Sequence, residues 1–197
     1  MCLLKEAASA WLDLVTTEYE IIAGRKGKQY KINLNFECTD FPHLAGMHYA
    51  RDVAFNLNAN EYHGEKLVYA LVSDRLDGKA IEKSRNWTKI QGRLKAIINL
   101  KQTLDTKFQL ALFNQKNVPT GSKIDADYLI KNLDTGETYF IFIDEDQNHR
   151  QYCKSAFAQN KTDYMKNQAL LTLLKITKFE QDTKSVLFIH PNFTTKE

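Results

Sequence analysis

The stretch Tyr30-Lys31-Ile32-Asn33-Leu34-Asn35-Phe36-Glu37-Cys38 alternates strictly between apolar and polar side chains. The side chains of one face are all apolar: Tyr30, Ile32, Leu34, Phe36 and Cys38. A period of two is typical of a β-strand that has one face in the core and the other in water. This run therefore predicts a half-buried strand, from which the neighbouring elements can be worked out.

The residues before this strand predict a helix and a hairpin. Residues 3–17 have apolar side chains at helical spacing, namely Leu4, Ala8, Trp11, Leu12 and Val15. Residues 19–23 are then extended, and Arg25-Lys26-Gly27-Lys28 is a turn with three basic side chains. We expect residues 19–23 and 30–38 to pair as a β-hairpin around this turn.

The residues that follow the strand predict a short helix. Residues 42–50 have Pro42 in the first turn and either Thr39 or Asp40 as the cap. Residues 54–64 show no regular pattern, and we expect them to be irregular.

The remaining pattern separates helices from strands along the chain. Two more helices are predicted, at 64–76, closed by Asp77-Gly78, and at 87–104. The second half predicts strands: 107–113, 128–132, 138–144, 151–158, 170–179 and 185–189. Residues 139–143 are apolar on both faces, which indicates a central strand. We expect an α+β fold, an antiparallel β-sheet packed against the helices of the N-terminal half, in a single domain over residues 1–197.

The composition is that of an ordinary globular chain. The 197 residues contain 27 Lys and Arg against 24 Asp and Glu, a formal net charge of +3, and 43% are hydrophobic. These values exclude a disordered or collagen-like chain, and no apolar run is long enough to span a membrane. Cys2, Cys38 and Cys153 form no CxxC pair, and the N-terminus lacks the pattern of a signal peptide. We expect a reduced, cytoplasmic protein.

The common phosphate-loop, dinucleotide, zinc-protease and serine-hydrolase motifs are absent from the sequence. Asp144-Glu145-Asp146 lacks the spacing of a calcium loop, and we expect a solvated turn there. His43 and His48 are five residues apart, so they do not share a helical face as paired metal ligands would. We therefore expect neither a metal nor a cofactor.

His43 is the strongest catalytic candidate in the sequence. It lies in Phe41-Pro42-His43-Leu44-Ala45-Gly46, between large apolar residues and beside a glycine. This setting predicts an imidazole at the edge of the sheet, partly removed from water, with a pKa suited to general acid–base work. The alternative is a structural histidine that caps the strand or bonds to the backbone.

Residues 30–52, an alternating strand that runs into Phe41-x-His43-Leu44-x-Gly46, resemble the phage-associated branch of the Barnase–EndoU–colicin–RelE (BECR) nuclease superfamily. The strands of residues 128–144 and the stretch Tyr152-Cys153-Lys154-Ser155 are compatible with that layout. The resemblance covers most of the chain, although only the Phe-x-His-Leu-x-Gly block is specific. It implies helices packed on an antiparallel sheet and a metal-independent RNase, often a toxin, from phage, prophage or conjugative elements.

The resemblance implies that the RNA 2′-OH attacks the adjacent phosphate and leaves a 2′,3′-cyclic phosphate. His43 matches the motif histidine and is the first candidate for the acid or the base. Arg93 and Ser155 are candidates for contacts to the phosphate, and Tyr139 for stacking or donating its hydroxyl. Their alternatives are a solvated helix face, a strand-end serine and a core tyrosine, respectively.

Further basic side chains are candidates for RNA contact: Lys89, Lys95, Lys154, Arg25, Lys26 and Lys28. An ordinary solvated surface is the alternative for each of them.

Other functions remain open at this point. The sequence lacks the compact acidic–basic set of barnase-like enzymes, which leaves a non-catalytic RNA- or protein-binding module on a degenerate nuclease fold as the alternative. An ADP-ribosyltransferase-like toxin ranks third, because its Arg, Ser-x-Ser and Glu-x-Glu set is not seen. The expected partners are RNA and a protein antitoxin or inhibitor, with no membrane.

Overall fold

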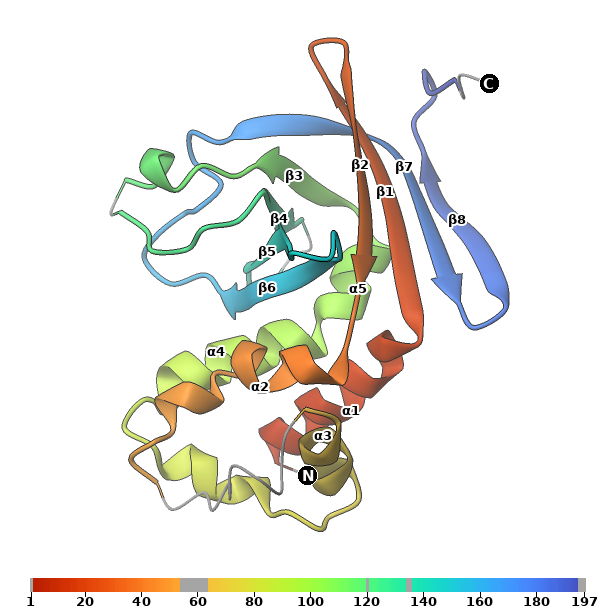
Figure 1. The fold of residues 1–197 in the computed structure, drawn as a ribbon. Coiled ribbons are helices and arrows are strands. Elements are labelled where there is room, and N and C mark those ends of the chain that lie inside the picture. Colours follow the sequence, from red (N-terminus) through yellow and green to blue (C-terminus); the bar gives the residue numbers. More distant parts are fainter. Residues whose placement is uncertain (1, 54–63, 120, 134–135, 195–197) are drawn as a thin grey trace.

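The computed structural model describes residues 2–53, 64–119, 121–133 and 136–194. The helices are α1 (Leu3–Val15), α2 (Phe41–Leu44), α3 (Glu65–Val72), α4 (Trp87–Ile98) and α5 (Leu100–Asp105). The strands are β1 (Thr17–Arg25), β2 (Lys28–Asn35), β3 (Phe108–Leu112), β4 (Tyr128–Asn132), β5 (Tyr139–Glu145), β6 (Gln151–Ala158), β7 (Ala169–Glu180) and β8 (Thr183–Ile189). Short 3₁₀ turns occupy Cys38–Asp40, Met47–Tyr49, Gly78–Lys83 and Gln115–Asn117. Figure 1 shows the helices gathered on one side of the strands.

The sheet closes on itself. Its strand order is β1-β2-β6-β5-β4-β3-β7, and β7 also pairs with β1. The closure depends on the length of β7, whose residues 169–171 pair with β3 and whose residues 172–180 pair with β1. The result is a seven-strand barrel, to which β8 adds an outer strand along β7.

Two features of this sheet differ from the prediction. The sheet closes into a barrel, which was not predicted, and it is not wholly antiparallel, because β2 and β6 run parallel. Periodicity shows which face of a strand is buried, but it does not show which strand lies beside it or in which direction. The expected mixture is confirmed: the α-helices end by Asp105, and most strands follow.

The hairpin at the start of the chain is confirmed, with Arg25 opposite Lys28 at its tip. The helix expected over 87–104 instead breaks at Asn99 into α4 and α5. The helix expected over 64–76 ends at Val72, and Asp77 caps the next 3₁₀ turn by accepting from the Lys79 backbone N–H at 2.9 Å.

Most of the stretch expected to be irregular, residues 54–63, lies outside the described residues. Within the described residues, a bilayer-spanning helix is not found.

The alternating strand faces the main core as expected. Ile32 and Leu34 of β2 are fully buried, and so is Trp11 of α1. The Trp11 indole N–H donates to the Glu37 carbonyl at 3.0 Å, and its ring lies edge-on to Phe36 at 5.5 Å. α1 is therefore fixed to the chain where it leaves β2.

β5 is buried on both faces, as its apolar run predicted. Ile141 and Ile143 face the main core, whereas Phe140 and Phe142 face a second, smaller cluster with Phe113 and others. β5 lies between β4 and β6, which is the central position expected for such a strand.

The candidate site lies where the short pairing between β2 and β6 ends and helices cover β6. The described pairing between these strands consists of Leu34 with Gln151 and Asn35 with Tyr152. Beyond Tyr152 the edge of β6 is covered by helices, and a Cβ on Gly92 of α4 would touch the Ala158 Cβ at 3.6 Å. Figure 1 shows α2 and α4 side by side beneath β6.

Candidate active site

The segment that carries His43 is a single helical turn, α2. Phe41 and Leu44 lie three residues apart on one face and are buried, at 0% and 1% exposure. Phe41 contacts the Trp11 ring, with the ring centres 6.4 Å apart. His43 lies on the outward face and is exposed. The two apolar residues of the motif are therefore anchors that hold the imidazole at the surface.

Gly46 ends this segment in a left-handed conformation, with φ of 74°. A Cβ at this position would lie 2.8 Å from the Cδ of Arg93 and 3.2 Å from the Tyr49 ring. Glycine both permits the turn and leaves room for the arginine of α4.

Arg93 is half-buried behind this turn. Its Nη1 donates to the Leu44 carbonyl and to the Ser155 hydroxyl, each at 3.4 Å. Its guanidinium also lies over the rings of Tyr49 and Phe157, at 5.4 and 5.8 Å. Arg93 thus joins α4, the His43 segment and β6.

The turn at Gly46 brings a second histidine to the first. The rings of His43 and His48 are stacked with centres 5.2 Å apart and an angle of 18°. His48 in turn contacts the Tyr49 ring at 4.0 Å. The spacing of five excluded a shared helical face, but the left-handed glycine between the two residues breaks the helix. Gly46 is therefore the sequence signal that could have predicted the pairing of His43 with His48, which was missed.

Both histidines favour the neutral form. The pKa of His43 is lowered first by partial loss of water, and then by the charges of Arg93 and Lys154, against a weaker opposite effect of Asp40. The pKa of His48 is lowered by the same loss of water and by His43, Arg93 and Arg51. His43, predicted to be partly removed from water at the edge of the sheet, lies exposed on α2, and the partial loss of water that it has there lowers its pKa.

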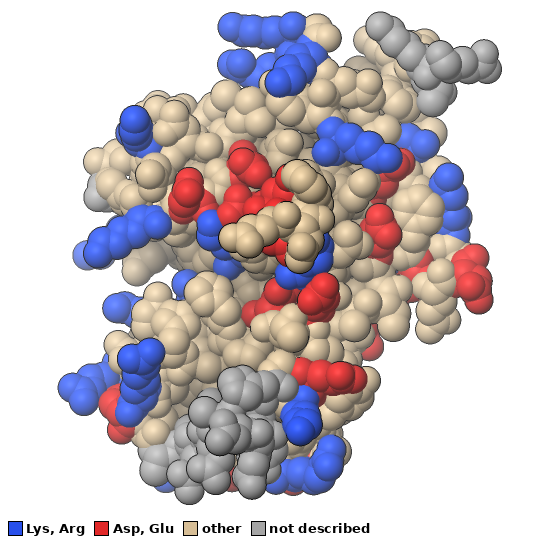
Figure 2. Space-filling view, in the orientation of Figure 1, with Lys and Arg blue, Asp and Glu red and all other residues tan. Residues whose placement is uncertain are grey.

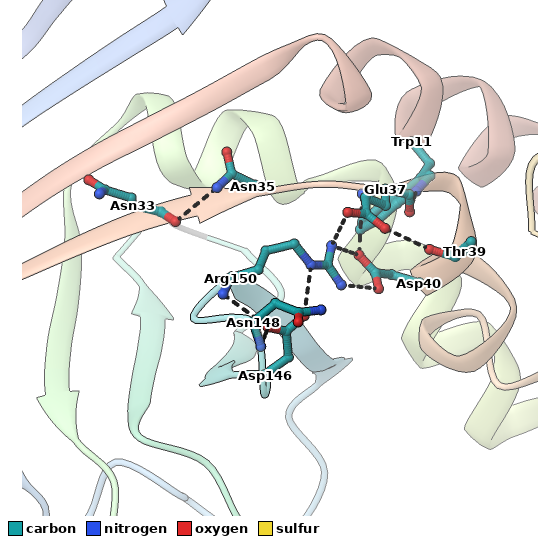
Figure 3. Close-up of polar contacts among 9 residues, drawn as sticks. All are labelled: Trp11, Asn33, Asn35, Glu37, Thr39, Asp40, Asp146, Asn148 and Arg150. Carbon is teal, nitrogen blue, oxygen red and sulfur yellow. Dashed lines mark hydrogen bonds and ion pairs between the residues drawn. The ribbon is translucent and has the colours of Figure 1, made fainter.

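A bidentate ion pair clamps the start of the His43 segment to the barrel. The Arg150 guanidinium donates through Nη1 and Nη2 to the two carboxylate oxygens of Asp40, each at 2.9 Å (Figure 3). Arg150 also reaches Glu37 at 3.5 Å and Asp146 at 3.4 Å. Asp40, one of the two predicted caps, instead accepts from the Glu37 backbone N–H at 3.2 Å. This pair fixes the 3₁₀ turn that precedes α2.

Ser155 and Lys154 lie side by side on β6. The register of β6 against β5 shifts between Phe142 and Ile143, so that Lys154 is the extra residue of a bulge. Lys154 forms an ion pair with Asp144. Ser155 is 5% exposed and faces Arg93. Its burial makes it a support for Arg93 rather than a surface donor.

The acidic run at the end of β5 is paired with cations. Asp144, Glu145 and Asp146 contact, in that order, Lys154, His149 and Arg150. Across the described residues, no group of three or more His, Cys, Asp or Glu side chains is placed to hold a metal ion.

Lys89 and Lys95 lie on α4 with Arg93, beside an open pocket of about 490 Å³ between α4 and the end of β6. Lys95 pairs with Glu137 at 3.1 Å. Tyr139 is 8% exposed, and its hydroxyl donates to Glu137 at 3.2 Å and accepts from Asn99 at 3.1 Å. The structure therefore places the Tyr139 ring in the core and not in a position to stack on a base.

The basic turn Arg25, Lys26 and Lys28 is far from these residues. Figure 1 shows the tip of the β1–β2 hairpin at the opposite end of the barrel from α2 and α4. In Figure 2 a group of Lys and Arg side chains covers that tip, and acidic side chains cover the strands below it. The structure thus brings together His43, Arg93 and Ser155, with Lys154, Lys89 and Lys95 around them, and leaves the hairpin turn apart.

The comparisons with known proteins agree with the motif. The model of the family phage-Barnase-EndoU-ColicinE5/D-RelE like nuclease4 (PBECR4) matches residues 3–190, from the first helix to just beyond the last strand. Comparisons with curated proteins and with solved structures gave no match. The family match includes the His43 segment, α4 and β6, which form the candidate site. The chain therefore belongs to the phage-Barnase-EndoU-ColicinE5/D-RelE like nuclease family PBECR4.

Proposed function

We propose that this protein is a metal-independent endoribonuclease with His43 and His48 as its acid–base pair. The observation that carries the proposal is the stacking of these two rings beside the Arg93 guanidinium. RNA cleavage by its own 2′-OH needs one group to accept a proton, one to supply a proton, and a cation to stabilise the phosphorane-like transition state. The site provides two imidazoles and a fixed arginine for these three tasks.

The proposed step balances without a further reactant. One neutral imidazole accepts the 2′-OH proton while the 2′-oxygen forms a bond to the adjacent phosphorus. The bond from phosphorus to the 5′-oxygen breaks, and the other, protonated imidazole gives its proton to that oxygen. The products are a 2′,3′-cyclic phosphate and a 5′-OH end. We assign His43 the first proton transfer, because it is the motif histidine and because partial loss of water, followed by the charges of Arg93 and Lys154, lowers its pKa and so favours the neutral form.

Arg93 is the proposed phosphate ligand. A guanidinium has five N–H donors, and its two hydrogen bonds among the described residues both come from Nη1. Ser155 and the Leu44 carbonyl hold that nitrogen in place, so they are positioning groups for Arg93. Lys154 adds positive charge near His43. Its ion pair with Asp144 partly neutralises that charge.

The family description supports a proposal for the biological setting. The phage link in the family description supports an effector or toxin of a phage or another mobile element, acting on RNA in the cytoplasm. A protein antitoxin or inhibitor that covers the His43 surface is the partner that such a role requires.

The test is cleavage of a single-stranded RNA by the purified protein in EDTA. Wild type should cleave it, His43→Ala should cleave about 10²–10⁴-fold more slowly, and His190→Ala, a histidine outside the site, should cleave like wild type. The product should carry a cyclic phosphate, and an RNA with a deoxyribose at the cleaved position should stay intact.

Three outcomes would count against the proposal. Equal cleavage by wild type and His43→Ala removes the assigned role of His43. Loss of activity in EDTA, restored by a divalent metal, removes metal independence. RNA binding that survives His43→Ala, without any product over pH 5–9 in wild type, supports the non-catalytic binding module instead.

A further inference from the structure

A pocket adjoins the histidine pair on the other side of Arg93. It lies between α4 and the segment that follows β6, and its volume of about 490 Å³ is within the range of small-molecule sites. Its walls come from α4 on one side and residues 157–162 on the other. Of the residues that line this pocket, the proposed cleavage step uses Arg93 alone.

The charge of the pocket suits an anion. Four cations line it, Lys89, Arg93, Lys95 and Lys161, against the single carboxylate of Glu137. Glu137 pairs with Lys95. Lys89 and Lys161 are exposed, and neither takes part in the ion pairs found among the described residues, although Lys89 lies over the Tyr49 ring at 5.6 Å. Two cations at the rim are therefore available for a phosphate.

Aromatic side chains also line the pocket. Tyr49, Phe157 and Tyr164 contribute aromatic side chains to its lining, and all three are only partly buried. Phe157 and Tyr164 lie edge-to-face with their centres 5.4 Å apart. Aromatic rings next to cations are the usual means by which proteins hold a single-stranded base and its phosphate.

Arg93 connects the pocket with the histidines. Its guanidinium contacts Phe157 and Tyr49, which both line the pocket, and the Tyr49 ring also contacts the ring of His48. A chain of nucleotides with its scissile phosphate at Arg93 would therefore have its next nucleotide beside the pocket.

We propose that this pocket is a nucleotide subsite, which takes the base and phosphate of the RNA residue next to the cleaved bond. This inference rests on the proposed function, since that function places the scissile phosphate at Arg93. Lys89 and Lys161 contact the phosphate of the bound nucleotide, and the partly buried aromatic rings contact its base.

Binding of an uncleavable RNA separates the subsite from the chemistry. The probe is a short 2′-O-methyl oligonucleotide with a fluorescent label, and its affinity is measured by anisotropy at several salt concentrations. Lys89→Gln and Lys161→Gln should each reduce the slope of log affinity against log salt by about 0.7, the share of one phosphate contact to a single strand. An oligonucleotide that lacks bases should bind wild type about tenfold more weakly.

The control is Lys28→Gln. It removes the same charge at the hairpin tip, and it should leave the slope unchanged. A wild-type protein that binds this probe but cleaves no ordinary RNA would contradict the proposed function but leave the subsite standing.

Two results would overturn the subsite itself. One is an equal loss of slope in Lys28→Gln and Lys89→Gln, which would mean diffuse attraction by the whole surface. The other is equal affinity for the oligonucleotides with and without bases, which would mean that the aromatic rings do not contact a base. Either result is compatible with cleavage at His43.

Discussion

A Cβ atom on residue 46 would lie 2.8 Å from the Cδ atom of Arg93, closer than side-chain carbons pack. Gly46 is also left-handed, a conformation in which other residues are strained. One glycine therefore turns the chain so that His48 meets His43, and leaves room for the arginine that lies between these histidines and β6. The motif glycine and Arg93 act as one structural unit although they are far apart in the sequence.

Replacing Gly46 should lower both the stability of the protein and its rate of RNA cleavage. Gly46→Ala should lower the free energy of unfolding by about 1–2 kcal/mol, from the left-handed conformation and the clash with Arg93. It should also slow RNA cleavage, because Arg93 must move. Urea unfolding and the cleavage assay measure the two effects. Gly136→Ala is the matched control, since a Cβ there would meet nothing within 4 Å, and an equal effect of both substitutions would contradict the argument.

Removing the charge of Arg93 should raise the pKa of both histidines. A neighbouring cation disfavours the protonated imidazole, so Arg93→Gln should move both values back towards the ordinary 6.5. Titration of the ring signals by NMR measures this shift, with Lys28→Gln as the control. In wild type the unfolded chain binds protons more readily at these histidines, so their contribution to stability is present above pH 6.5 and declines as the pH falls. If Arg93→Gln left the pKa values of His43 and His48 unchanged, the guanidinium would be too far from the two rings to affect their protonation.

Local patterns predicted much of the fold. The alternation around Ile32 and Leu34 indicated the buried face of β2, and the apolar run at 139–143 indicated a strand covered on both sides. Both predictions are confirmed because burial leaves a direct trace in the spacing of apolar residues. The closure of the barrel could not be predicted from the spacing of apolar residues. It depends on which part of β7 lies beside β1 and which part lies beside β3.

The candidate site was predictable only in part, for a similar reason. His43 was found from its own short motif, whereas the hydrogen bonds of Arg93 to the Leu44 carbonyl and the Ser155 hydroxyl join residues 49 and 62 positions apart. His48 was missed because spacing arguments assume a regular helix and the chain breaks at Gly46. Lys26 and Lys28 looked equivalent to Lys89 in sequence, but only Lys89 shares a surface with Arg93.

The ion pair between Arg150 and Asp40 should contribute more to the free energy of unfolding than an ordinary surface ion pair does. The side chains are 20% and 11% exposed and meet through two hydrogen bonds. Arg150→Gln should therefore lower the free energy of unfolding by about 1–3 kcal/mol, because it leaves the Asp40 carboxylate partly buried without its partner. Lys31→Gln breaks the more exposed pair with Glu20 and should cost less than about 1 kcal/mol.

The same clamp should matter for the position of His43. If Arg150 holds the turn before α2, then Arg150→Gln should also change the ring signals of His43 in the folded protein and slow cleavage. Unfolding by urea and NMR of the native state separate the two effects. A loss of stability with unchanged His43 signals would mean that the clamp supports the barrel but does not position the histidine.

The pairing of His43 with His48 gives the sharpest kinetic prediction. If one imidazole must be neutral and the other protonated, cleavage should depend on pH as a bell, with both limbs below pH 6.5 because both pKa values are lowered. His48→Ala should remove one limb and slow the reaction about 10²–10⁴-fold, and the double variant His43→Ala, His48→Ala should be no slower than the slower single variant. Removal of His43 should also raise the pKa of His48, since the two charges repel. A full bell in His48→Ala would show that the second proton comes from another group, and Lys154, whose charge already acts on His43, would be the next residue to replace.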